Sequence, residues 1–94
     1  MKMPGSKLYS IEYITSVIEE DIPKLPSHMK SMIRKAIEER LTIDPIGFGK
    51  PLRYSLKGHR RLRVGDYRIV YRIDSETHIV LVIAIKHRKD VYEN

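Results

Sequence analysis

Apolar and polar residues alternate along residues 59–73 in the way expected of two neighbouring β-strands. In the first strand Leu62 and Val64 share one face, and the other face carries His59, Arg61 and Arg63. Gly65-Asp66 is a turn dipeptide, because glycine adopts positive φ angles without a steric penalty. In the second strand two arginines share a face made of Arg68, Val70 and Arg72, opposite Tyr67, Ile69, Tyr71 and Ile73. The pattern predicts a β-hairpin with one apolar face and one face rich in arginine.

The longest apolar run of the chain extends from Ile79 to Ile85 and predicts a further strand over residues 78–86. Strict alternation would put the odd-numbered residues of this run on one face and the even-numbered residues, followed by Lys86, on the other. Both faces are apolar, so we expect this strand to be central in the sheet and covered for most of its length. A shorter alternation over residues 7–14 predicts a first strand.

Two helices are predicted between the first strand and the hairpin. The first begins at Ser16, where Ser16 and Glu19 form a capping-box pattern, and Pro23 is expected to kink or end it. The second runs from about His28 to Thr42. Its apolar stripe follows helical spacing and consists of Met29, Met32, Ile33, Ala36, Ile37 and Leu41.

Asp44-Pro45 ends the second helix, and the glycines and prolines of residues 45–58 predict a loop before the hairpin. The predicted order of elements is therefore β-α-α-β-β-β. Early helices followed by a strand meander are typical of an α+β fold, with an antiparallel sheet core and both N-terminal helices packed on one face. A chain of 94 residues has the size of one domain, so we expect a single domain over residues 1–94.

The positive charge is concentrated in the half of the chain that carries the hairpin. Residues 1–49 contain seven Lys/Arg and seven Asp/Glu, whereas residues 50–94 contain eleven Lys/Arg and five Asp/Glu, which accounts for the net charge of +6. The polar positions of the hairpin strands are almost all arginines, which repel one another unless an anion lies among them. This placement indicates a surface for nucleic acid or phosphate. A basic surface without a partner is the alternative.

The composition also excludes several classes of site. The chain contains no cysteine, which rules out disulfides and thiolate metal sites and suits a reducing cytoplasm. No apolar run reaches the roughly 20 residues of a membrane span, and the N-terminus lacks the apolar region of a signal peptide. No group of His, Asp and Glu has the spacing of metal ligands. We therefore expect a cytoplasmic protein with no membrane contact, no metal and no cofactor.

The segment from Leu62 to Arg68, the ending from His87 to Tyr92 and the order of elements together resemble the RelE/ParE superfamily of type II toxins. The likeness extends from Leu8 to Tyr92. It implies a small toxin that is neutralised by a cognate antitoxin protein wrapped around it. RelE-type members cleave mRNA in the A site of the 30S ribosomal subunit, whereas ParE-type members poison DNA gyrase.

The resemblance assigns roles to individual residues. Arg68 matches the hairpin arginine that contacts the scissile phosphate, Tyr92 matches a C-terminal tyrosine used in catalysis or substrate positioning, and Arg88 matches the tail arginine. Lys86 lies where RelE-like sequences often place another basic residue, and it would point toward the same site as Arg88 if the strand continued. An exposed strand charge at position 68 and a core anchor at position 92 are the alternatives.

Arg61 and His59 occupy positions at which RelE carries two lysines, and this difference changes the expected chemistry. Arginine stays protonated, so Arg61 is expected to act as an electrostatic clamp and not as a base. Histidine titrates near neutrality, which makes His59 and His87 the candidates for acid–base catalysis, although a lone histidine is often a bystander. The remaining basic side chains predicted to bind RNA are Lys57, Arg60, Arg63 and Arg72.

These residues favour an endoribonuclease that works without a metal ion. Such an enzyme orients the 2′-OH of one nucleotide for attack on the adjacent phosphate, stabilises the extra negative charge and moves two protons. Arginine matches the phosphate oxygens, and an aromatic ring such as that of Tyr92 stacks on a base. A ParE-like gyrase poison requires no such groups and is the first alternative. A degenerate relative that only binds nucleic acid or antitoxin is the second.

Overall fold

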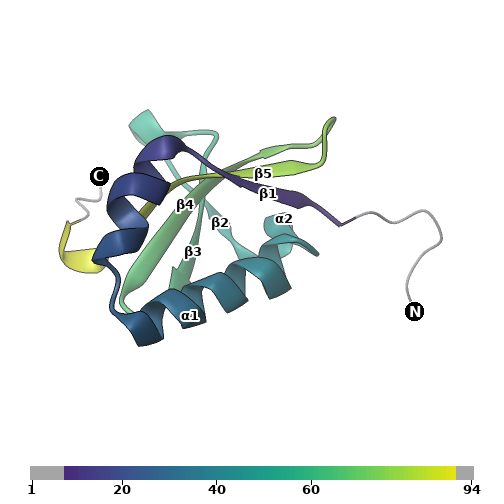
Figure 1. Ribbon diagram of the computed structural model, residues 1–94. Helices are drawn as coiled ribbons and strands as arrows, with labels where there is room; N and C mark the ends of the chain where they lie inside the picture. Colours follow the sequence, from purple (N-terminus) through teal and green to yellow (C-terminus); the bar gives the residue numbers. More distant parts are fainter. Residues whose placement is uncertain (1–7, 91–94) are drawn as a thin grey trace.

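The computed structural model describes residues 8–90, which form one sheet with its longest helix, α1, along one face (Figure 1). The first half contains β1 (Ser10–Tyr13), η1 (Val17–Asp21), η2 (Ile22–Lys24), α1 (Ser27–Ala36), η3 (Ile37–Leu41) and α2 (Pro45–Phe48). The second half contains β2 (Lys50–Pro51), η4 (Tyr54–Leu56), β3 (Arg60–Val64), β4 (Tyr67–Asp74), β5 (Ile79–His87) and η5 (Arg88–Asp90). The predicted α+β class is confirmed.

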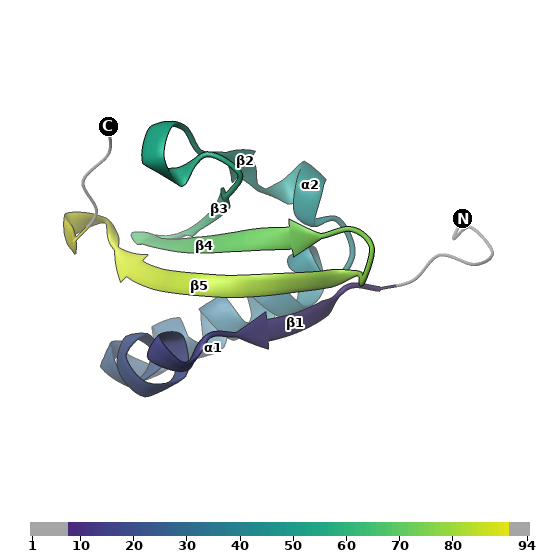
Figure 2. The ribbon, with the colours of Figure 1, turned by 90° about the horizontal axis from the view of Figure 1, so that it is seen from above.

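The sheet is mixed, whereas the sequence suggested a wholly antiparallel sheet. Its strand order is β1-β5-β4-β3-β2. The pairs β2–β3, β3–β4 and β4–β5 are antiparallel, whereas β1 runs parallel to β5, with Ser10 opposite Ile79 and Tyr13 opposite Val82. Parallel neighbours need a long connection, and the N-terminal helices supply the first part of it. Figure 2 shows β5 between β1 and β4, so it is an interior strand as predicted, although its face opposite α1 is only half-buried and not covered for most of its length.

The hairpin of β3 and β4 forms where the sequence predicted it. Val64 lies opposite Tyr67, and Gly65-Asp66 makes the two-residue turn between them. Gly65 has φ +59°, the angle that a type II′ hairpin turn requires at its first central position. A side chain at this position would be strained, which explains the glycine.

The core lies between the sheet and the helices α1 and η3. Figure 1 shows α1 along one side of the sheet and η4 on the opposite side, and Figure 2 shows the same arrangement, with α1 behind the strands. The largest fully buried side chains are those of Tyr71, Ile33, Ile37, Leu41, Ile69, Val17, Val80, Val82 and Pro45. Met32, which was assigned to the apolar stripe of the second helix, is 49% exposed. It lies one residue before Ile33 and so points about 100° away from the buried stripe.

A β-bulge interrupts the pairing of β4 with β5. Val70 lies opposite Ala84 and Tyr71 lies opposite Val82, so Ile83 is an extra residue on β5. The prediction of strict alternation along this strand is therefore wrong.

The bulge decides which side of the sheet the end of β5 presents. Before the bulge Val82 is buried in the core, and after it the buried residue is Ile85. Lys86 consequently pairs with Arg68 and shares its face, away from α1. Without the extra residue, Lys86 would follow the even-numbered valines into the core.

The helix boundaries agree with the sequence except at one cap. The Ser16 side chain makes no capping hydrogen bond, because its backbone (φ −63°, ψ −29°) is already helical, and helical geometry begins at Thr15. Pro23 lies in η2, the 3₁₀ turn that ends this first helical segment, as expected. The second helical segment, α1 followed by η3, runs from Ser27 to Leu41.

Residues 45–58, predicted as a loop, contain α2, β2 and η4. Two side chains from the sheet hold α2 in place. The Tyr71 hydroxyl donates to the Pro45 carbonyl (2.6 Å), and Arg60 Nη2 donates to the carbonyls of Ile46 (2.7 Å) and Gly49 (3.0 Å). A Cβ on Gly49 would lie 1.7 Å from the Tyr71 hydroxyl oxygen, so this close approach requires glycine.

Candidate functional site

Three basic residues lie side by side across the last three strands on the face opposite α1. Arg63 of β3 is opposite Arg68 of β4, and Arg68 is opposite Lys86 of β5. Directly opposed residues of antiparallel strands share a face and stand about 5 Å apart at their Cβ atoms. We call Arg63, Arg68 and Lys86 the cationic row. Arg61, which is opposite Val70, lies on the same face one step along the hairpin.

Arg68 is the most enclosed member of the cationic row, with 7% of its surface exposed. Burial, followed by the charges of Arg61 and Arg63, lowers the pKa of its guanidinium below the ordinary arginine value. An arginine remains charged near neutral pH in such surroundings. The row therefore concentrates positive charge at a partly desolvated position, where an anion is bound more strongly than in open solvent.

Lys86 is held by Asp21, a residue that the sequence reasoning missed. Lys86 Nζ lies 2.8 Å from Asp21 Oδ1, and Asp21 Oδ2 accepts the backbone N–H of Ile85 (2.9 Å). The pKa of Lys86 is raised above its ordinary value, and the hydrogen bond with Asp21 is the largest cause. A lysine with a raised pKa is a poor general base near neutrality, so Lys86 fits an electrostatic role. The sequence did contain a signal for this residue, because Asp21 is an acid among the apolar positions of the first helix.

His59 precedes β3 and belongs to the segment around η4, not to the strand as predicted. Its carbonyl accepts the N–H of Leu52 (2.9 Å), and its Nδ1 lies 3.2 Å from the Leu56 carbonyl oxygen. The ring is thus held against the segment around η4. His59 stands two residues before Arg61 in the chain, directly ahead of β3.

His87 ends β5 and pairs with Tyr67, on the other side of the strand from Lys86. The two rings meet edge to face at a centroid distance of 5.1 Å, and Nδ1 of His87 accepts the Lys89 N–H (3.1 Å). Both His87 and Lys86 border a hollow of about 350 Å³ at the end of β5. An RNA strand lying on the cationic row would not contact His87 unless it entered this hollow.

The tail residues do not continue β5. Arg88 begins η5, its N–H donates to the Asp66 carbonyl (2.8 Å), and its Nε lies 3.7 Å from Asp66 Oδ1. Arg88 and Lys86 therefore do not alternate along one strand, which corrects the expectation that a continued strand would aim both at one site. Tyr92 lies outside the described residues.

The other predicted RNA ligands occupy three different places. Arg60 is opposite Tyr71 on the core side and holds α2, so the structure does not bring it to the cationic row. Arg72 shares the face of Arg68 but borders a hollow with Glu12 and Asp74 near the other end of the sheet. Lys57 is exposed directly after η4.

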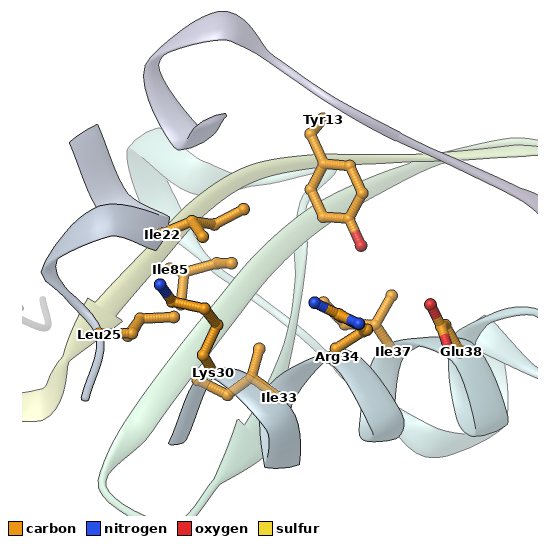
Figure 3. Close-up of a pocket in the computed structure, with 9 residues that line it drawn as sticks. All are labelled: Tyr13, Ile22, Leu25, Lys30, Ile33, Arg34, Ile37, Glu38 and Ile85. Atoms are coloured by element: carbon orange, nitrogen blue, oxygen red, sulfur yellow. The ribbon is translucent and has the colours of Figure 1, made fainter. Parts of the chain in front are cut away.

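An apolar cleft of about 270 Å³ separates η2 from α1, away from the cationic row (Figure 3). Ile22, Leu25, Ile33, Ile37 and Ile85 line it, and the rim carries Tyr13, Lys30, Arg34 and Glu38. Figure 3 shows the Tyr13 ring pointing into the space above Arg34 and Glu38. Burial, and then the charge of Glu38, raises the pKa of Tyr13 above its ordinary value.

Within residues 8–90 no three side chains of His, Asp or Glu gather closely enough to hold a metal ion. Over the same residues, none of the helices is both long and apolar enough to cross a membrane.

Comparisons with known proteins place the chain among toxins of type II toxin–antitoxin systems. The family model described as the ParE toxin of the type II toxin–antitoxin system parDE matches residues 13–92. Toxin RelG of Mycobacterium tuberculosis is 34% identical over a region covering 89% of this chain and 95% of that protein. Toxin RelE of the same organism is 37% identical, covering 84% of this chain and 81% of that protein.

Solved structures agree with these relatives. The toxin–antitoxin complex RelBE from M. tuberculosis contains a chain that is 33% identical, with a TM-score of 0.81, covering 86% of this chain and 99% of that one. The isolated E. coli RelE toxin, at 21% identity, has a TM-score of 0.69 over 84% of this chain and 83% of its own, and so shares the fold. The family match and the relatives above 30% identity show that the chain belongs to the RelE/ParE superfamily and is a RelE-like toxin of a type II toxin–antitoxin system.

Proposed function

We propose that this toxin is an endoribonuclease that cleaves mRNA in the ribosomal A site, in the cytoplasm, without a metal ion. The observation that carries the proposal is the cationic row, in which Arg68 lies between Arg63 and Lys86 beside Arg61. Guanidinium groups held by a sheet are preorganised, so they need not rearrange when negative charge develops on a phosphate. Arg68 would bind the non-bridging oxygens of the scissile phosphate, and Arg61 and Arg63 would bind the neighbouring backbone.

The proposed reaction is attack of a 2′-OH on the adjacent phosphorus. The O2′–P bond forms, the bond from phosphorus to the 5′ oxygen of the next nucleotide breaks, and that oxygen leaves with a proton. The products are a 2′,3′-cyclic phosphate and a 5′-hydroxyl. We favour His59 over His87 as the base, because His59 directly precedes the strand that carries Arg61, whereas the His87 ring packs edge to face against Tyr67 on the other side of the sheet from Lys86. Tyr92 remains the predicted aromatic for base stacking or proton transfer.

The purified toxin tests this proposal on mRNA bound to ribosomes. We expect cleavage that leaves a 5′-hydroxyl on the downstream fragment. Chelation of free divalent ions, at a level that leaves ribosomes intact, should not abolish cleavage. Loss of cleavage under chelation, with recovery on adding magnesium to intact ribosomes, would contradict the metal-independent mechanism.

A gyrase poison is the second candidate function, and the match to a family model named for ParE favours it. A gyrase supercoiling assay separates the two functions. We expect the toxin to leave supercoiling unchanged at concentrations that cleave ribosome-bound mRNA. Inhibited supercoiling without mRNA cleavage would support the ParE-like function instead.

The proposed partners are mRNA, the ribosome and a cognate antitoxin. The similar M. tuberculosis chain was solved as a toxin–antitoxin complex, which supports an antitoxin for this chain. An acidic segment of the antitoxin is expected to cover the cationic row, because it would neutralise the charges that RNA would otherwise meet.

A further inference from the structure

The residues between β2 and β3 form a loop that leaves the sheet and is closed by its own backbone hydrogen bonds. The N–H of Leu52 donates to the His59 carbonyl at its base (2.9 Å). Inside it, the N–H of Leu56 donates to the Arg53 carbonyl (3.1 Å) and the N–H of Lys57 donates to the Tyr54 carbonyl (3.0 Å). Short loops with such internal bonds hold their side chains in defined positions. We call residues 52–59 the η4 arm.

Tyr54 at the centre of the η4 arm has two unusual properties. Its φ is +58°, in the left-handed region that residues other than glycine, asparagine and aspartate rarely enter. Its surface is nevertheless 68% exposed, the largest value among the exposed large apolar and aromatic residues of the described chain. Because the Tyr54 ring is exposed, its burial does not offset the cost of the strained backbone. A stabilising contact of the ring within the chain therefore does not explain the strain.

The charge around Tyr54 identifies the kind of partner that fits. From Pro45 to Gly65 the chain contains Lys50, Arg53, Lys57, Arg60, Arg61 and Arg63, and no aspartate or glutamate. Figure 1 shows η4, the turn between β2 and β3, across the sheet from α1, the side that the cationic row faces, and Figure 2 shows the same turn next to the β2–β3 edge. An exposed aromatic ring among cations beside a phosphate-binding face is the arrangement that binds single-stranded nucleic acid.

We infer that Tyr54 is a positioning residue whose ring stacks on an unpaired RNA base next to the phosphate held by the cationic row. The inference rests on the proposed nuclease function and adds a base contact to it. Stacking is tolerant of sequence because every base has a π-face, so Tyr54 would fix where the strand lies and not which base it carries.

A fluorescence titration tests the contact directly, because the chain contains no tryptophan. Tyr54→Trp introduces a single indole, and we expect a short single-stranded RNA to quench its emission. Inorganic polyphosphate, which has the charge but no bases, should not. Phe48→Trp, at a 50% exposed position on α2, is the matched control and should respond to neither. Equal responses of the two variants to RNA, or equal quenching by polyphosphate, would overturn the inference.

Cleavage kinetics distinguish this inference from the proposed function itself. We expect Tyr54→Ala to raise KM about tenfold or more with little change in kcat, and Tyr54→Phe to restore the wild-type value. If the wild-type toxin cleaves mRNA and Tyr54→Ala has the same KM, the stacking role is wrong and the nuclease stands. If the wild-type toxin cleaves nothing, the nuclease is wrong, and RNA quenching of Tyr54→Trp still decides whether the arm binds bases. Quenching by an antitoxin peptide but not by RNA would assign the arm to the antitoxin and overturn the inference.

Discussion

At the scale of single residues, Arg68 carries the largest part of the proposed chemistry. Its neighbours on both sides are basic, and it is the most enclosed of the three. A charge so placed is useful when it meets the extra negative charge of a phosphate transition state.

Arg68→Ala should reduce the cleavage rate by about 10² to 10³, the usual effect of removing one preorganised donor. Arg72→Ala is the matched control, because Arg72 lies on the same strand and face but beside Glu12 and Asp74. It should cost less than about tenfold. Arg68→Lys keeps the charge but loses the planar, two-pronged guanidinium, so its cleavage rate should also fall well below that of the wild type. Thermal unfolding of each variant checks that the fold is intact, and equal losses in the Arg68 and Arg72 alanine variants would contradict the assignment.

Replacing His59 and replacing His87 should have different effects on the pH–rate profile. Histidine titrates near neutrality, so replacing the residue that accepts the 2′-OH proton removes the acid limb of the profile. We expect His59→Gln to flatten this limb and His87→Gln to preserve it. If both variants keep the wild-type rate and profile, neither histidine is the base, and Tyr92 or arginine electrostatics alone must account for the reaction.

At the scale of elements, the contact between η1 and β5 depends on Asp21, which holds both Lys86 and the Ile85 N–H. The hydrogen bond raises the pKa of Lys86, so the folded state binds this proton more tightly than the unfolded state. The stabilisation should be fully present below the ordinary lysine pKa of 10.5 and lost as the pH rises through the higher folded value.

Unfolding free energies of wild type and Lys86→Met measure this contribution. We expect a difference of under about 1 kcal/mol near pH 8, because solvent screens the partly exposed amine, and a progressively smaller difference as the pH rises above the ordinary lysine pKa of 10.5. Lys35→Met, on the exposed side of α1, should show no such trend. A difference that grows with pH would reverse the predicted sign. Asp21→Ala should cost more, about 1–3 kcal/mol, because it also leaves the buried Ile85 N–H without its acceptor.

Most elements could be predicted from the sequence because their periodicities are local. Two features that shape the cationic row could not. The bulge at Ile83 adds a residue to β5, and an apolar run on both faces does not show where its alternation changes phase. The bond from Asp21 to Lys86 joins residues 65 apart in the sequence, and only the packing of η1 on the edge of β5 brings them together. The row of Arg63 and Arg68 was predictable, whereas the addition of Lys86 to it depended on the bulge.

At the scale of the whole molecule, the basic face and the apolar cleft are separate surfaces, and an antitoxin could depend on either. The net charge of +6 and the cationic row favour the basic face. We expect antitoxin affinity to fall steeply as salt is raised, since exposed charges are screened beyond a Debye length of about 8–10 Å. An affinity unchanged from low to high salt would favour capture by the apolar cleft of Figure 3.

The most direct measurement of the central claim maps mRNA 5′ ends by sequencing after brief induction of the toxin. Cells expressing the wild-type toxin should show new ends at one fixed position within codons of translated reading frames. Cells expressing Arg68→Ala at the same level should not, because the same protein then lacks the charge that stabilises the phosphate. New ends that ignore the codon phase, or the same phased ends in both strains, would contradict a ribosome-dependent nuclease built on the cationic row.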